Sequence, residues 1–183
     1  MTDRRTSTNE QKPTAPPDRR GQRHMAKRSR IIDNAWSLAR RDGLAGISLR
    51  DLADSVDLRQ PSLYAYFESK LDLYDAMFED GQRQLLDRSR AREPLADPRD
   101  ELVAVVEDLV RFSSEDIVRH QLLFQRTIAG FEPSATAMEP AWRVFDAFQA
   151  DRMRAFEVDS LATTRPIEFP VESPADATGM FDV

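Results

Sequence analysis

The chain has 183 residues, of which 40% are apolar, so it is long enough for one compact domain or for a small domain joined to a second. It contains no cysteine, which excludes a disulfide framework and thiolate chemistry and makes a reducing cytoplasm the simplest compartment. No apolar run approaches the roughly 18 residues that a membrane-spanning helix needs, so we expect no membrane partner.

The net charge of −6 is distributed unevenly along the chain. Residues 1–70 carry 14 Lys and Arg against 9 Asp and Glu, whereas residues 71–183 carry 12 against 23. A basic N-terminal third is attracted to phosphate groups, and the acidic remainder is repelled by them. An ordinary solvated surface can carry the same charges, so charge alone leaves nucleic-acid binding open.

Residues 1–25 contain three prolines and almost nothing to bury, and we expect them to form a disordered basic arm. The arginines of this arm either keep the chain soluble or reach into the minor groove of DNA. From about residue 26 the apolar residues recur at helical spacing, which predicts a helix over 26–42. Gly43 can supply the left-handed cap at its end.

A helix-turn-helix is indicated over about residues 48–67. Ser48 and Asp51 resemble a capping box and predict a helix over 48–55. Residues 56–58 form a short break, and a second helix is expected from about Gln60 through Phe67, with Pro61 at an early position where its missing N–H costs little. Two short helices joined by about three residues, the second polar on its outer face, are typical of a helix that enters the major groove of DNA.

Several side chains of this segment are candidates for contact with DNA. Gln60 can pair with adenine, Pro61 can touch a thymine methyl group, and Arg50 can reach guanine or a phosphate. Tyr64, Tyr66 and Lys70 suit phosphates, although either tyrosine could instead be a packing residue and Arg50 only a solvated one. The complete set of expected DNA-binding residues is Ser48, Arg50, Arg59, Gln60, Pro61, Ser62, Tyr64, Tyr66 and Lys70.

The rest of the chain is also predicted to be helical, so the fold class is all-α. Ser69 and Asp72 resemble a helix start, and a long amphipathic helix is expected to about residue 92. Three more helices are expected near 98–113, 115–130 and 139–157, with Pro140 in the first turn of the last one. The predicted organisation is a basic arm (1–25), a helix-turn-helix domain (26–70), a helical effector-binding and dimerisation region (71–158) and an irregular tail (159–183).

Residues 28–80 resemble the N-terminal domain of the TetR family of repressors. The residues that carry the resemblance are Gly43, Ile47-Ser48, Leu52-Ala53, Leu63-Tyr64-x-Tyr66-Phe67 and Ser69-Lys70-x-x-Leu73. The resemblance implies a homodimer that binds a palindromic DNA operator, and a helical C-terminal domain that binds a small effector. Asp57 stands where the family commonly has glycine in the turn, and we expect it to adopt the left-handed conformation at modest cost.

The resemblance also implies two further long helices that form the dimer interface. Only about 25 residues of irregular pattern follow the last expected helix, so we expect a shortened C-terminal domain that dimerises poorly. Large apolar residues on the three preceding helices predict an effector cavity, although aromatic residues at helical spacing are more often ordinary core. The expected lining residues are Phe112, Phe124, Gln125, Trp142 and Phe145.

No catalytic, cofactor or metal-binding pattern accompanies these motifs. His24 and His120 are the only histidines, and neither has partners at metal-ligand spacing. We therefore expect no enzyme and no cofactor. The predicted function is a ligand-responsive transcriptional repressor, and the alternative is a helical protein-interaction or small-molecule-binding module that no longer reads DNA.

Overall fold

The computed structural model describes residues 19–125 and 127–162, with side chains as far as 156. The described part contains helices and no strand, in agreement with the predicted all-α class. The helices are α1 (Arg19–Asp42), α2 (Leu49–Ser55), α3 (Gln60–Leu63), α4 (Lys70–Ala91), α5 (Pro98–Glu115), α6 (Ile117–Phe124) and α7 (Ala135–Ala162).

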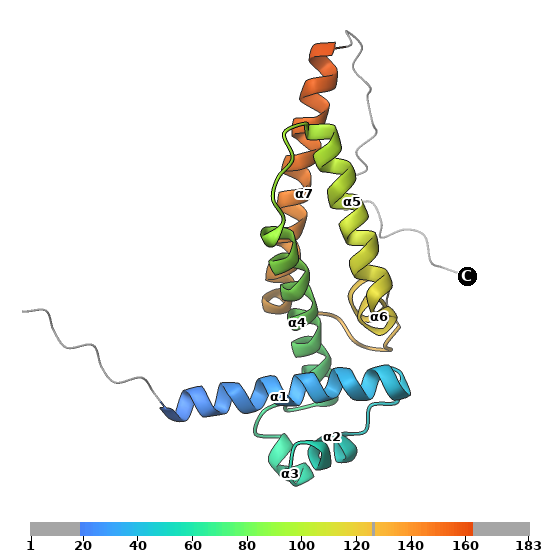
Figure 1. Ribbon diagram of the computed structural model, residues 1–183. Helices are drawn as coiled ribbons and strands as arrows, with labels where there is room; N and C mark the ends of the chain where they lie inside the picture. Colours follow the sequence, from blue (N-terminus) through green and yellow to red (C-terminus); the bar gives the residue numbers. More distant parts are fainter. Residues whose placement is uncertain (1–18, 126, 163–183) are drawn as a thin grey trace, which may run out of the picture.

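The seven described helices form two layers that meet at α1. In Figure 1, α1 lies across the molecule, α2 and α3 lie on one side of it, and α4, α5 and α7 stand on the other. Helix α7 packs chiefly against α4 and α5, while α6 contacts α1, α4 and α5. No described helix is both long and apolar enough to cross a membrane.

A single hydrophobic core joins the two layers. Ile31 and Ala35 of α1, Leu52 of α2 and Leu73 of α4 are all fully buried in one cluster, which continues into α5 and α6. The N-terminal half of α4 therefore belongs to the core of the helix-turn-helix as well as to that of the upper layer. The expected boundary at residue 70 separates two layers of helices, but it does not separate two cores.

Boundaries of four helices, α1, α3, α6 and α7, differ from those expected from the sequence. Helix α1 begins at Arg19, so residues 19–25 are helical rather than part of a disordered arm, and residues 1–18 of that expected arm lie outside the described residues. Helix α7 begins at Ala135, where the Ser134 hydroxyl accepts a hydrogen bond from the Ala137 N–H at 3.1 Å. Pro140 is therefore inside the helix rather than in its first turn.

Helix α6 is shorter than the expected 115–130. It ends at Phe124, and Gln125 takes an extended backbone conformation. Ile128 and Phe131 nevertheless pack against the core from the irregular segment that follows. Their apolar spacing resembled a continued helix, but the core also accepts such side chains from a loop. Most of the expected tail over 159–183 lies outside the described residues, and its first four residues belong to α7.

Candidate nucleic-acid interface and internal cavity

The start of the helix-turn-helix is fixed by the N-cap of α2. Ser48 has an extended backbone, and its hydroxyl accepts a hydrogen bond from the Asp51 N–H at 3.3 Å. This satisfies one of the amide groups that the first turn of a helix leaves without a partner. Leu52 and Ala53 turn inward and are fully buried, while Arg50 remains exposed on the outer side.

The turn between α2 and α3 depends on a left-handed residue. Asp57 has a φ of +56°, as expected from the sequence. The N–H groups of Val56 and Leu58 both donate to the Ala53 carbonyl, at 3.2 and 2.9 Å, which closes the end of α2. The Lys27 ammonium of α1 donates to the Val56 carbonyl and so attaches the turn to the long helix beneath it.

Helix α3 is a single turn held by one buried leucine. Leu63 is only 2% exposed, and the N–H groups of Tyr66 and Phe67 both donate to its carbonyl, which ends α3 earlier than the expected Phe67. The structure places the remaining side chains of this turn in solvent. The exposed residues are Arg59, Gln60, Pro61, Ser62 and Tyr64.

Tyr66 and Lys70 are partly buried and have protein partners. The Tyr66 ring stacks on His24 of α1, with centroids 4.6 Å apart and an interplanar angle of 14°. The Lys70 ammonium donates to the Ala45 carbonyl at 3.0 Å and lies 5.6 Å from the centre of the Tyr74 ring. Both residues thus stabilise the packing of the helix-turn-helix domain (residues 26–70), which we call the reading head. Phosphate contact by either residue remains a prediction.

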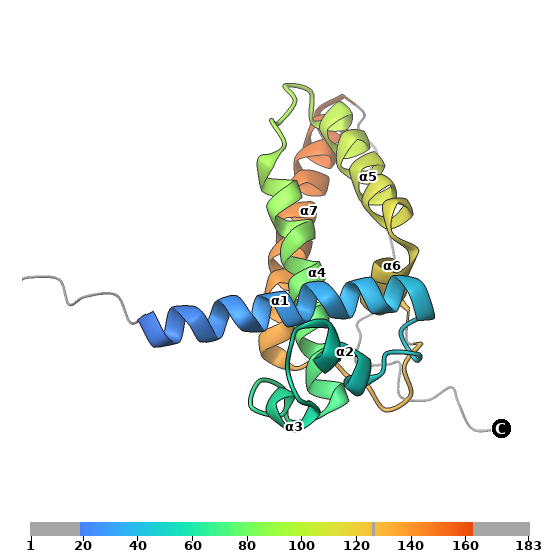
Figure 2. The same cartoon turned by 60° about the horizontal axis from the view of Figure 1, so that its bottom comes forward.

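The N-terminal half of α1, residues 19–30, is a basic surface, of which residues 19–25 were expected to belong to a disordered arm. Residues 19–30 contain no acidic residue, and this part of α1 extends beyond α2 and α3 in both overall views (Figure 2). It buries no side chain before Ile31, so it shows no apolar periodicity, and only its lack of proline signalled a helix. Its cationic residues are Arg19, Arg20, Arg23, Lys27, Arg28 and Arg30.

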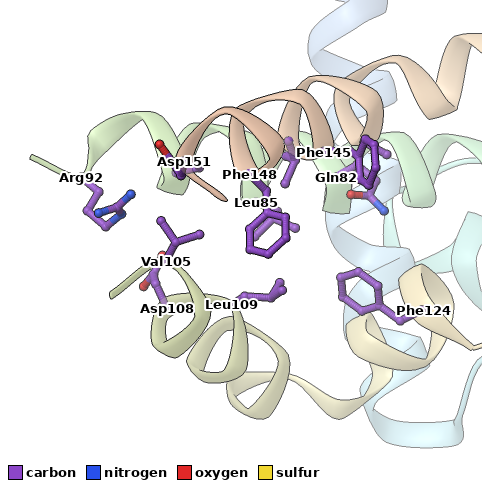
Figure 3. Close-up of a pocket in the computed structure, with 13 residues that line it drawn as sticks. Gln82, Leu85, Arg92, Val105, Asp108, Leu109, Phe124, Phe145, Phe148 and Asp151 are labelled. Atoms are coloured by element: carbon purple, nitrogen blue, oxygen red, sulfur yellow. The ribbon is translucent and has the colours of Figure 1, made fainter. Parts of the chain in front are cut away.

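A half-open cavity of about 280 Å³ lies between α4, α5 and α7 (Figure 3), and the rings of Phe124 and Phe145 at its edge are exposed. Of the five residues expected to line it, Phe124 and Phe145 do so. Phe112 is instead 3% exposed and packs in the core with the Arg119 guanidinium 3.7 Å from its ring centre. Trp142 is 52% exposed and does not line the cavity. The sequence did not distinguish it from the lining residues, because α7 has apolar residues on both of its faces.

Gln125 belongs to a second, more polar hollow, not to this cavity. That hollow has a volume of about 460 Å³ and lies beside the segment that follows α6. Phe124 and Gln82 contribute to both spaces. Gln82, which is 4% exposed, was not predicted from the sequence, because apolar periodicity does not mark a polar residue as buried.

Ion pairs tie the helices around the cavity together. Both terminal nitrogens of Arg92, at the end of α4, donate to the carboxylate of Glu101 on α5. This pairing, opposed in part by burial and assisted by the Leu95 N–H, lowers the pKa of Glu101 to about 2. Arg88 of α4 likewise binds Asp108 and Glu115 of α5 at 2.8 and 2.7 Å.

One ion pair joins the upper layer to the reading head. Arg40 of α1 binds Asp116 at 2.8 Å, and Asp116 also caps α6 by accepting from the Val118 and Arg119 N–H groups. Burial raises the pKa of Asp116, but these hydrogen bonds and the nearby guanidinium groups outweigh it and leave that pKa lowered.

Among the described residues there is no cluster of His, Cys, Asp and Glu that could hold a metal ion.

The comparisons with known proteins agree with this geometry. The model of "Bacterial regulatory proteins, tetR family" matches residues 31–77, which extend from α1 into α4. A stretch of 48 residues is 42% identical to the biofilm operon icaADBC negative transcriptional regulator IcaR of Staphylococcus aureus strain Newman. That match covers 26% of this chain, and the chain spans about a quarter of the length of IcaR.

Solved structures share the fold over a longer part of the chain. The TetR-family transcriptional regulator PfmR of Thermus thermophilus has a TM-score of 0.58 at 22% identity, over 76% of this chain and 75% of PfmR. RolR in complex with the ligand resorcinol has a TM-score of 0.55 at 21% identity, over 76% of this chain and 68% of RolR. Residues 31–77 of the chain are thus similar to the tetR family of bacterial regulatory proteins, and the described helices share the fold of solved TetR-family regulators.

Proposed function

We propose that the protein is a transcriptional repressor that binds operator DNA through α2 and α3 and responds to a small molecule bound between α4, α5 and α7. The observation that carries the proposal is the exposed polar side of α3. It lies beside the N-terminal half of α1, which is basic and contains no acidic residue. A groove-reading helix and a cationic flank are the two parts that sequence-specific DNA binding requires.

The two parts have different tasks in this proposal. Leu63 anchors α3 in the core, so Arg59 and Gln60 at its start can point toward base edges, where arginine pairs with guanine and glutamine with adenine. The cations of α1 and Arg50 contact the phosphate backbone, which contributes affinity without sequence preference. The acidic remainder of the chain, residues 71–183, is repelled by DNA. This repulsion favours an orientation in which α1, α2 and α3 approach the DNA first.

A second copy of the chain is the proposed partner on DNA. Repressors of this geometry read palindromic operators with two heads about 34–36 Å apart, one for each half-site. A small-molecule effector is the second proposed partner, and a cytoplasmic location is proposed with the regulatory role. The complex of RolR with resorcinol shows that one protein of similar fold holds a small aromatic ligand.

The proposal is tested by fluorescence anisotropy with a labelled duplex from the DNA upstream of the gene, and with a scrambled duplex of equal length. We expect the wild type to prefer the upstream duplex by about a thousandfold or more at physiological salt. Gln60→Ala should weaken binding by about 1–3 kcal/mol and reduce discrimination at one operator position, because the lost contact is to a base.

Gln84→Ala is the matched control, since Gln84 is an exposed glutamine on α4 whose partners, Asp80 and Arg119, lie outside the reading head. It should bind DNA as the wild type does. Equal binding of upstream and scrambled duplexes would overturn the proposal and favour a helical protein-interaction module. Equal weakening by Gln60→Ala on every duplex would leave a DNA-binding protein in which Gln60 does not read a base.

A further inference from the structure

The cavity between α4, α5 and α7 has mostly apolar walls, and the uncharged polar side chains that line it are Gln82 and Ser89. Leu85, Leu109 and Phe148 line its middle, and Phe124 and Phe145 line the end at which Gln82 lies (Figure 3). Gln82 is only 4% exposed, and it lies between this cavity and the more polar hollow beside it, lining both. An amide that lines a cavity can donate a hydrogen bond to a ligand or accept one from it.

The charged groups at the other end of the cavity are already neutralised. Arg92 and Asp151 lie at that end in Figure 3, with Asp108 on the opposite wall. Arg92 is held by Glu101, and Asp108 is held by Arg88. The Asp151 carboxylate pairs with Arg154 of the same helix.

This pairing bears on the charge of the occupant. A carboxylate or an ammonium group that entered the cavity would lose part of its hydration and find no uncompensated opposite charge to replace it. A neutral molecule has no such penalty. Because the walls are aliphatic and aromatic, it also gains from burying apolar surface against them.

We propose that the cavity binds a small neutral aromatic molecule whose single hydroxyl or carbonyl group hydrogen-bonds to the Gln82 amide. The inference rests on the proposed ligand-responsive function and names the chemical class of its effector. The volume of about 280 Å³ is at the low end of small-molecule sites, which fits one or two fused rings. The rings lie between Leu85, Leu109 and Phe148, and the polar group lies toward Gln82.

Three probes of equal ring size test this assignment by isothermal titration calorimetry at neutral pH: naphthalene, a naphthol and the corresponding naphthoate. We expect the naphthol to bind about two- to tenfold more tightly than naphthalene, the ratio that one neutral hydrogen bond supplies. The naphthoate should bind at least about tenfold more weakly than the naphthol, because its carboxylate stays charged.

Gln82→Leu then identifies the hydrogen-bonding group. The variant should bind naphthalene as well as or better than the wild type and lose the preference for the naphthol, because leucine has similar volume and no polar atom. Gln84→Leu, two positions along α4 on the exposed side, should keep the preference. Retained naphthalene binding also shows that Gln82→Leu has folded.

The outcomes separate this inference from the proposed function. Tight naphthoate binding, or a naphthol preference that survives Gln82→Leu, would overturn the assignment of ligand class even if DNA binding is specific. Failure of all three probes to bind the wild type would overturn it as well. A Gln82-dependent preference for the naphthol supports the ligand class, and anisotropy with upstream DNA then reports separately whether the proposed regulatory function holds.

Discussion

Glu101 is a buried carboxylate whose charge is required for the joint between α4 and α5. It accepts from Arg92 and from the Leu95 N–H, which closes the loop between the two helices. Its pKa of about 2 lies below the ordinary value of 4.5, so the folded protein holds this carboxylate ionised more strongly than the unfolded chain does. The resulting stabilisation is complete above pH 4.5 and is lost as the pH falls toward 2.

Glu101→Gln should remove this pH dependence. We expect the variant to be less stable than the wild type at pH 7, and the difference to shrink as the pH falls from 4.5 toward 2, because the unfolded wild-type chain takes up a proton at Glu101 in this range while the folded protein keeps the carboxylate ionised. Urea unfolding of both proteins at several pH values measures it. A constant difference between the two proteins across this range would contradict the assignment, and Glu107→Gln, on the exposed side of α5, serves as the control.

At the scale of elements, α1 has two different halves. Its C-terminal half buries Ile31, Ala35 and Trp36 in the core, whereas its N-terminal half buries no side chain and carries cations. Lys27 and His24 attach that basic half to the reading head through the Val56 carbonyl and the Tyr66 ring. The helix therefore holds its charges in a fixed position beside α3.

Removing two of these charges should weaken DNA binding without changing specificity. For Arg23→Gln with Arg30→Gln we expect the slope of log affinity against log salt to fall by about two units, since each phosphate contact contributes about 0.9. Anisotropy titrations at several salt concentrations measure the slope. The control is Arg152→Gln, an exposed arginine near the end of α7 that lies far from α3 in Figure 1. An unchanged slope in the double variant would show that α1 does not contact phosphates.

At the scale of the whole molecule, α6 connects the cavity with the reading head. Its first turn is capped by Asp116, which binds Arg40 of α1, and its last residue, Phe124, lines the cavity. A ligand that displaces Phe124 can therefore shift α6 and, through the ion pair, α1. Arg40 is half exposed, so the pair itself contributes only about 0–1 kcal/mol to stability.

Arg40→Met should weaken the coupling between ligand and DNA. We expect DNA affinity without ligand to stay within about twofold of the wild type, and the loss of affinity that a saturating naphthol causes to become several-fold smaller. Anisotropy with and without the naphthol measures both quantities. Arg41→Met is the control, because Arg41 bonds to Asp42 of its own helix. An equal effect of the naphthol on wild type and Arg40→Met would rule out this route.

The outer side of α7 governs a further whole-molecule property, self-association. Trp142, Met153 and Phe156 lie on one stripe of this helix and are 43–56% exposed. Exposed apolar stripes favour association, but each of these side chains is already about half covered and charged residues lie among them, so the contact should be weak. Poor dimerisation therefore stays a prediction.

Sedimentation at micromolar concentrations should therefore show a monomer in concentration-dependent equilibrium with a dimer. Met153→Ser should shift that equilibrium toward monomer, because it removes apolar surface from the stripe, whereas Arg143→Ser on the same helix should not. A tight dimer at the lowest measurable concentration would show that the described helices form a sufficient interface, and that the expectation of poor dimerisation is wrong.

The sequence by itself determined the helix-turn-helix. Ser48, Asp57 and Ser69 act within a few residues of their own position, as caps or as a left-handed turn, and the structure has each in its expected place. Local hydrogen bonding and backbone sterics decide such features, so they can be read from a short stretch of chain. The all-helical class followed in the same way from apolar periodicity.

Only the tertiary structure decided which side chains line the cavity and where α1, α3, α6 and α7 begin or end. Phe112 and Trp142 have similar sequence patterns, yet one packs in the core beneath Arg119 and the other faces solvent. The burial of Gln82 likewise depends on how α5 and α7 close over α4. Apolar periodicity identifies the face of a helix that is buried, but not which neighbour covers it, because that depends on contacts between residues far apart in the chain.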